Sequence, residues 1–252
     1  NDRLGTVACV ANRTNGGYRL RGVKEPVEAA DQADQLLITA RTDEGLAHFL
    51  VAADLPGLTV TPMEGLDITR RYASIELADV DIPASALLGH LGTAELQTEY
   101  LLQVAVVLQL AEMVGAMDRS FEMTVEWAFS RYSFGRPLAS YQALKHRFAD
   151  MRAWLEAAHA MADAAAQHVQ ADSRRASEYV SAGKSYLGVY GPELVQDCVQ
   201  MHGGIGVTFD HDLHLYLRRV VIGSQLFGTV SDHRQRLASI LESRHPFTSE
   251  GI

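Results

Sequence analysis

The first ninety residues contain short hydrophobic runs that are separated by polar, proline and glycine positions. Residues 17–23 alternate between apolar and polar side chains, and LLITAR, AHFLVA, LTVTPM and ASIELADVDI are short apolar or alternating runs. Alternation with a period of two is typical of strands that bury one face. The pattern predicts an all-β unit of five or six short strands, antiparallel where hairpins connect them.

From residue 93 onward the apolar positions recur at helical spacing. Residues 93–131 contain no proline and a single glycine, and Gly135–Pro137 then interrupts the pattern. Pro137 suits the first turn of a following helix. The pattern predicts helices at 93–131, at 138–168, from the polar turn ADSRRASEY to about His202, and near 212–222 and 231–244.

Strands followed by helices, without βαβ alternation, indicate an α+β chain. Helices of this length need partners on more than one face, which favours a bundle. We therefore predict a small antiparallel β-domain at residues 1–90, followed by an up-down helical bundle at residues 91–252.

Composition narrows the classes of function. The 252 residues are 47% hydrophobic, enough for a core, and carry a net charge of −9, which gives no general attraction to nucleic acid. Cys9 and Cys198 form neither a disulfide framework nor a CxxC pair, which suits the cytoplasm. The apolar run 101–111 is too short to span a bilayer and contains glutamines, so no membrane association is expected. No signal peptide is visible, and the start at Asn1 suggests that an N-terminal segment has been removed.

The segment QMHGGIGVTFD, residues 200–210, resembles a phosphate-binding loop. A Rossmann fingerprint requires a strand before the glycines and a helix after them, whereas these glycines follow a predicted helix. Two interpretations remain. Gly203 and Gly204 stop the helix, or they let a flat or charged group approach the backbone.

Four stretches carry a resemblance to a known family: GGYRLRGVK, RYSFGRPLASYQALKHRFADM, QMHGGIGVTFDHDLHLYLRR and FGT. Together they resemble the acyl-CoA dehydrogenase family of flavoproteins, over about residues 5 to 243. The resemblance implies a middle β-domain, here incomplete at its N-terminus, and a C-terminal four-helix bundle, without the family's N-terminal helical domain. It also implies FAD as cofactor and an acyl-CoA thioester as substrate, oxidised to a 2-enoyl-CoA.

The resemblance assigns six cofactor-binding residues: Arg131, Phe134, Gln200, Gly203, Gly204 and Thr229. In the family, the equivalents of Arg131, Phe134 and Gln200 contact the pyrophosphate and adenine portion of a neighbouring subunit's FAD. Without the resemblance, Arg131 reads as a solvated charge at a helix end and Phe134 as a core aromatic residue. His202, His211 and His214 are interpreted as structural or surface residues, and no metal site is expected.

The catalytic glutamate of the family has no counterpart at either of its usual places. Phe227 stands at one, before Gly228, and Ala105 is nearest the other. Neither side chain can accept a proton, and Glu99 and Glu112 are poor matches. We therefore assign no catalytic residue to this chain.

Positions that face the chain's own flavin in the family also depart from its pattern. Pro26 and Glu28 replace a tryptophan and a threonine, and Ser231 replaces a glutamine. The residues that would contact a partner's flavin are retained. This contrast predicts a subunit that contributes FAD-binding residues to a paralogous, base-bearing partner, as in bacterial α2β2 enzymes acting on steroid-derived CoA thioesters. A self-sufficient homomeric dehydrogenase with an atypical base and a non-enzymatic structural homologue remain as alternatives.

Overall fold

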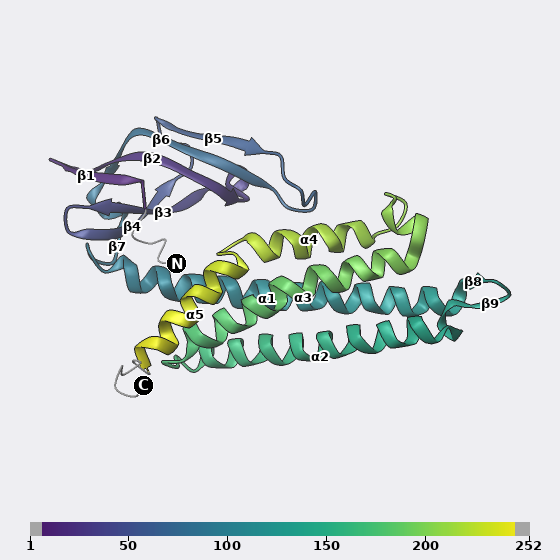
Figure 1. Cartoon of the computed structure of the whole chain (residues 1–252). Helices are drawn as coiled ribbons and strands as arrows, with labels where there is room; N and C mark the ends of the chain where they lie inside the picture. The colour runs from purple at the N-terminus through teal and green to yellow at the C-terminus, as the bar shows by residue number, and fades with distance from the viewer. Residues whose placement is uncertain (1–6, 245–252) are drawn as a thin grey trace. The chain divides into compact units, whose positions relative to one another are not determined.

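The computed structural model describes residues 7–244. Of these, residues 7–101 form one compact unit and residues 102–244 form the other. Figure 1 shows strands throughout the first unit and long helices in the second. This order confirms the predicted α+β class.

The described residues of the first unit form a seven-stranded sheet in the order β5-β6-β2-β1-β3-β4-β7. The strands are β1 (Val10–Thr14), β2 (Gly17–Glu28), β3 (Gln35–Thr42), β4 (Gly45–Ala52), β5 (Leu58–Met63), β6 (Tyr72–Pro83) and β7 (Leu87–Leu88). Neighbouring strands are antiparallel except β1 and β3, which pair in parallel at Val10 and Arg41. The predicted antiparallel hairpins are therefore present, within a mixed sheet. Short 3₁₀ turns, η2 (Ala30–Gln32) and η3 (Ala84–Ala86), interrupt the connections.

Side-chain alternation along the strands builds the core of this unit. Leu36 and Ile38 on β3, Phe49 on β4, and Ile75 and Leu77 on β6 are all buried in one hydrophobic cluster. Alternate positions point outward, as the sequence pattern predicts.

Pro26 lies inside β2, where a proline cannot contribute a ladder hydrogen bond. The pairing of β2 with β6 shifts register between Lys24 and Val27, so Pro26 falls within an irregularity of the ladder. The bulge explains how a strand with neighbours on both sides accommodates a proline.

The second unit consists of α1 (Ala94–Ser130), most of which belongs to it, α2 (Gln142–Gln170), α3 (Ala176–His202), α4 (Leu213–Gln225) and α5 (Val230–Arg244). A two-stranded ribbon, β8 (Tyr132–Ser133) and β9 (Arg136–Pro137), and the 3₁₀ turn η4 (Leu138–Ser140) connect α1 to α2. The expectation that Pro137 opens the second helix is wrong, because Pro137 belongs to the ribbon and α2 begins at Gln142.

The helix α1 is long and apolar enough to cross a membrane by length and composition, with mean hydropathy 1.6 over its most apolar 18 residues. The apolar run 101–111, which the sequence analysis considered too short to span a bilayer, is shorter than this 18-residue stretch. Val106, Leu110, Met113 and Met117 nevertheless lie buried in the hydrophobic cluster of the bundle. These contacts are those of a core helix in a helical bundle.

The helix α3 packs against α2, α4 and α5 and depends on small residues to do so. A Cβ at Gly188 would lie 2.5 Å from Val230 Cγ2, and one at Gly191 would lie 3.3 Å from Met113 Cε. Gly188 leaves no room for a side chain and Gly191 leaves little, so both allow neighbouring groups to approach the backbone of α3 closely. Cys198, on the same helix, is buried and free, as is Cys9 in the sheet unit.

Two glycines inside helices provide a matched test of this packing. Gly115→Ala, on an open face of α1 with nothing within 4 Å of the added Cβ, should stabilise the chain by about 0.5–1 kcal/mol through helix propensity. Gly188→Ala gains the same propensity but overlaps Val230, and should destabilise the chain by about 1–3 kcal/mol. The urea concentration at the midpoint of unfolding measures the stability of both variants. Equal stabilisation by the two substitutions would contradict close packing at Gly188.

Candidate functional site

One end of the bundle collects most of the residues that the sequence singled out. There α1 ends at Ser130, the β8–β9 ribbon follows, α3 ends at His202, and the 3₁₀ turn η5 (Gly203–Val207) begins. Figure 1 shows the ribbon and the end of α3 at the same end of the bundle. Five of the six predicted residues belong to these segments, and all five are exposed: Arg131, Phe134, Gln200, Gly203 and Gly204.

Arg131 is the first residue beyond α1, and its backbone N–H donates to Trp127 O at 2.8 Å. The guanidinium carbon lies 5.8 Å from the centre of the Trp127 ring, within the range of a cation–π contact. Trp127 in turn stacks on His202, with ring centres 5.3 Å apart and planes 18° from parallel. This stack joins the ends of α1 and α3 and holds an exposed cation beside them.

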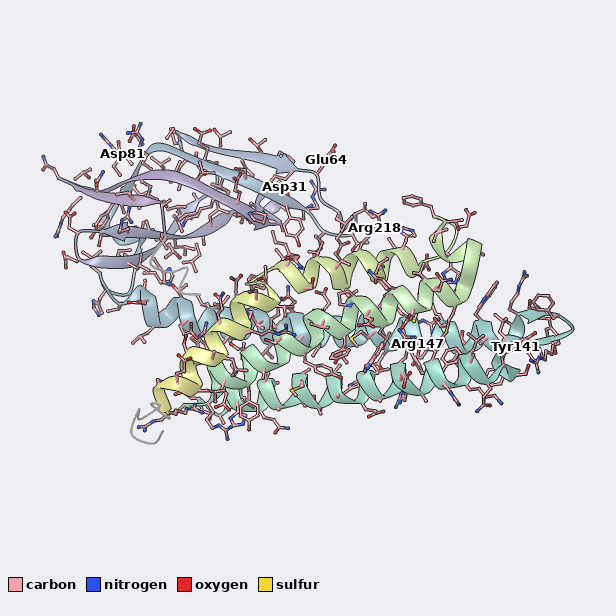
Figure 2. The ribbon with its side chains drawn as sticks, in the orientation of Figure 1. Asp31, Glu64, Asp81, Tyr141, Arg147 and Arg218 are labelled. Atoms are coloured by element: carbon pink, nitrogen blue, oxygen red, sulfur yellow. The ribbon has the colours of Figure 1, made fainter. Side chains whose placement is uncertain are left out.

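Phe134 occupies the turn of the β8–β9 ribbon, is 97% exposed, and has a φ of 50°. The alternative interpretation, a core aromatic residue, is therefore wrong. The ribbon is fixed by Tyr141, labelled in Figure 2, whose hydroxyl donates to Ser133 O at 2.7 Å and whose ring lies 3.9 Å from the Arg136 guanidinium carbon. A bulky residue held in a left-handed conformation and fully in water is typical of a functional position.

The glycines at the end of α3 have separate roles. Gly203 terminates the helix with a φ of 66°, which confirms the helix-stop interpretation. A Cβ at Gly203 or Gly204 would meet nothing within 4 Å, so this backbone is also open to a ligand. Gly206 differs, because a Cβ there would lie 2.5 Å from Val199 O. The first two glycines leave space for an approaching group and the third serves packing.

A hollow of about 390 Å³ is lined by Arg119, Met123, Glu126, Trp127, Ser130, His202 and His211. The Nδ1–H of buried His202 donates to Cys198 O at 2.8 Å, and burial lowers the pKa of this imidazole. His211 Nδ1 accepts from the Leu213 N–H at 3.2 Å, at the start of α4. The described residues contain no cluster that could hold a metal ion. These contacts agree with the structural interpretation of both histidines.

Thr229, the sixth predicted residue, lies elsewhere in the bundle. It precedes α5, where its N–H donates to Asp232 Oδ2 at 2.9 Å and its hydroxyl oxygen accepts from the Asp232 N–H at 3.3 Å. This reciprocal pair is a helix N-cap. The 13 residues of α4, about 20 Å of helix, separate Thr229 from the end of η5. The six predicted residues therefore form two groups.

The two positions where the resemblance expects a catalytic base carry no ionisable group. Phe227 lies in the turn between α4 and α5, 43% exposed with a φ of 57°, and Ala105 lies on α1. Glu112, on α1, forms an ion pair with Arg219 of α4. Glu112 therefore has a structural role, because its ion pair connects α1 with α4.

Two further positions that depart from the family's pattern lie one in each unit. Glu28 pairs with Arg70 Nη1 at 2.5 Å, so a cation compensates its negative charge. Ser231, in the first turn of α5, is exposed to solvent.

Sequence reasoning missed Lys184, which is fully buried on α3. Its Nζ donates to Gln109 Oε1 of α1, to Gly223 O of α4, and to Leu226 O at 2.7 Å. Burial lowers the pKa of Lys184 to about 7. A signal was available, because Val180, Leu187 and Leu194 repeat at helical spacing and place Lys184 on the same buried face.

A mixed, mostly antiparallel sheet followed by a helical bundle, with an arginine, a glutamine and open glycines exposed at one end of the bundle, defines a two-unit α+β protein. Residues 95–241 match the model of the acyl-CoA dehydrogenase C-terminal domain. The acyl-CoA dehydrogenase IpdE2 of Mycobacterium tuberculosis is 33% identical over 200 residues, 77% of this chain and 57% of that relative. The chain belongs to the acyl-CoA dehydrogenase family and spans a little over half the length of this relative.

Solved structures agree on the fold. A glutaryl-CoA dehydrogenase from Mycobacterium smegmatis in complex with FADH2 superposes with a TM-score of 0.87 at 25% identity, over 95% of this chain and 62% of that one. The ChsE4–ChsE5 complex from Mycobacterium tuberculosis superposes with a TM-score of 0.86 at 29% identity, over 92% of this chain and 62% of that one. The sheet and the bundle of this chain therefore both have the fold seen in these structures.

The environment of Lys184 leads to a stability prediction. Lys184→Met keeps the length of the side chain but leaves two backbone carbonyls unpaired, which should cost roughly 2 kcal/mol or more at pH 9. Because the folded pKa of Lys184 lies below its unfolded value, the lysine itself lowers stability as pH falls towards 7. The difference in free energy of unfolding between wild type and variant should therefore become smaller as the pH falls from 9 to 7. Thermal or urea unfolding measures it, with exposed Lys145→Met as the control, and a constant gap would contradict the prediction.

Proposed function

We propose that this chain is the FAD-binding, base-lacking subunit of a heteromeric flavin-dependent acyl-CoA dehydrogenase. The assembly would convert an acyl-CoA thioester into a 2-enoyl-CoA. One observation carries the proposal. The bundle end keeps Arg131, Gln200 and the open glycines, while both places for a catalytic carboxylate hold Phe227 and Ala105.

The bundle end fits the nucleotide portion of FAD. An exposed guanidinium can pair two phosphate oxygens through its planar fork. Gly203 and Gly204 leave their backbone open to a pyrophosphate, and the exposed Gln200 amide offers both a donor and an acceptor. The Phe134 ring supplies a flat apolar surface for adenine. When bound, FAD supplies the hydride acceptor that amino-acid side chains lack.

The second half of the proposal is that the proton acceptor belongs to a partner. Removing a proton beside a thioester requires a positioned base, and phenylalanine and alanine have none. Glu112 is engaged with Arg219. Pro26 and Glu28 stand at positions that face the chain's own flavin in the family. Pro26 has no backbone N–H to donate, and Glu28 is paired with Arg70. The residues that would contact a neighbouring subunit's FAD are therefore retained, whereas those that would contact the chain's own FAD are altered.

A paralogous subunit is the partner that fits this division of residues. ChsE4–ChsE5 is described as a complex of two differently named proteins, and this chain resembles its fold at 29% identity. An α2β2 assembly in the cytoplasm would let each copy of this chain place Arg131 and Gln200 against FAD held by the partner. A bulky acyl group, such as a steroid-derived one, is the substrate class that the resemblance to bacterial α2β2 enzymes implies.

Expression alone and with a base-bearing paralogue tests the proposal directly. The chain alone should purify without flavin absorbance or dehydrogenase activity, because it would supply only part of the site. Co-expression should give a yellow, active complex whose mass by light scattering contains both chains. A yellow, active homomer would replace the proposal with a self-sufficient dehydrogenase, and lack of flavin in every pairing would favour a non-enzymatic role.

Arg131→Ala should weaken FAD binding by the assembled complex roughly tenfold to a hundredfold. The substitution removes a charge-assisted phosphate contact worth on the order of 1.5–3 kcal/mol. Flavin fluorescence measures the dissociation constant. Arg152→Ala is the control, because Arg152 is an exposed arginine that pairs with Glu156 on α2. Equal FAD affinity in the two variants would reduce Arg131 to a helix-end charge.

A further inference from the structure

The hairpin between α1 and α2 presents an aromatic side chain from an unfavourable backbone conformation. Strands β8 and β9 pair Ser133 with Arg136, which leaves Phe134 and Gly135 as the two residues of the turn. Their φ angles are 50° and 79°, positive at both central residues as in a type I′ turn. Asparagine or aspartate before glycine is the usual sequence of such a turn, so a phenylalanine at the first position is disfavoured.

The ring of Phe134 is 97% exposed, so burial within this chain does little to offset the cost of that conformation. A hairpin whose strands have two residues each is also marginal in water by itself. On a mobile hairpin, an exposed apolar ring gains free energy by folding back onto apolar surface. The observed turn therefore requires groups outside it that hold it in place.

Tyr141 contacts both strands of the hairpin, at the bundle end where Figure 2 labels it. Its hydroxyl donates to Ser133 O at 2.7 Å, and its ring lies 3.9 Å from the Arg136 guanidinium carbon. Ser133 O belongs to the planar peptide unit that carries the Phe134 N–H, so this bond fixes the plane from which Phe134 departs. The cation–π contact with Arg136 holds the opposite strand.

Tyr141 is itself fixed at the beginning of α2. Its backbone oxygen accepts from the Lys145 N–H at 3.0 Å, and its own N–H donates to Leu138 O at 3.0 Å. At the base of the hairpin, the Leu138 N–H donates to Arg131 O at 2.9 Å. These bonds connect α2 to the peptide unit before Phe134 and leave the ring of Phe134 free.

We propose that Tyr141 is a positioning residue for cofactor binding, which holds the hairpin so that the Phe134 ring is presented in one orientation. Its role rests on the proposed function, in which that ring offers a surface to the adenine portion of a neighbouring subunit's FAD. A ring that is already ordered loses little conformational freedom when a base stacks on it. Tyr141 acts through the hairpin rather than by contact with the cofactor.

Backbone relaxation of the full chain tests the hold on the hairpin without any cofactor. In wild type, the ¹⁵N order parameters of residues 133–136 should match those of rigid backbone, about 0.85. Tyr141→Phe removes only the hydroxyl, and these order parameters should then fall below about 0.6. Tyr186→Phe is the matched control, because the Tyr186 hydroxyl also donates to a backbone oxygen, Trp154 O at 3.4 Å, elsewhere in the bundle. Order parameters that stay high in Tyr141→Phe would overturn the proposal.

The FAD affinity of the assembled complex tests the positioning role. Tyr141→Phe should weaken FAD binding roughly fivefold, the factor that corresponds to one neutral hydrogen bond, whereas Tyr186→Phe should leave it unchanged. Phe134→Asn places the favoured Asn-Gly pair in the turn, so the hairpin should stay ordered. Loss of the ring should nevertheless weaken FAD binding roughly tenfold or more.

The double variant decides whether Tyr141 acts through Phe134. In the Phe134→Asn background, Tyr141→Phe should cause no further loss of FAD affinity, because the ring that it positions is absent. An equal loss in both backgrounds, or no loss in either, would overturn the proposal.

Arg131→Ala in the same complex separates this outcome from failure of the proposed function. If Arg131→Ala weakens FAD binding and Tyr141→Phe does not, the positioning role fails while the proposed function stands. If neither Arg131→Ala nor Phe134→Asn changes FAD affinity, or no pairing of subunits binds FAD, the proposed function fails and the positioning role fails with it.

Discussion

Burial of a polar, positively chargeable side chain inside the bundle is the constraint on which the helix arrangement depends. Lys184 has no contact with solvent, so each of its hydrogen bonds must go to protein. Its acceptors come from α1 and from the end of α4, which fixes α3 relative to both. Glycines at 188 and 191 then let α3 approach its neighbours closely enough for those bonds to form.

The same arrangement brings the ends of α1 and α3 together. Trp127 and His202 stack across that junction, and the residues that follow each helix, Arg131 and Gly203, extend beyond it into solvent. The exposed groups therefore owe their placement to buried contacts behind them. A bundle with looser packing would still contain these residues but would not present them as one surface.

Much of this fold is visible in the sequence, and the exceptions have physical causes. The helix ends were predicted within a few residues, because Gly203 and the polar turn before Ala176 are strong local signals. Strand β1 was missed, since VANRT has no clear alternation and its position depends on pairing with β2 and β3. The site residues came from the resemblance to a family rather than from periodicity. Neither periodicity nor the resemblance predicted that Thr229 lies apart from the other five site residues, because its position depends on the direction of α4. Neither predicted the burial of Lys184, because this burial depends on partners distant in sequence.

The stacked indole of Trp127 also determines what can be seen optically. The chain has two tryptophans, Trp127 on α1 and Trp154 on α2, and both belong to the bundle. Intrinsic tryptophan emission therefore reports the melting of the helices, while the sheet unit contributes no indole signal of its own. Coincidence of fluorescence with far-ultraviolet circular dichroism would reveal whether the two units unfold together. Fluorescence alone would describe only one of them.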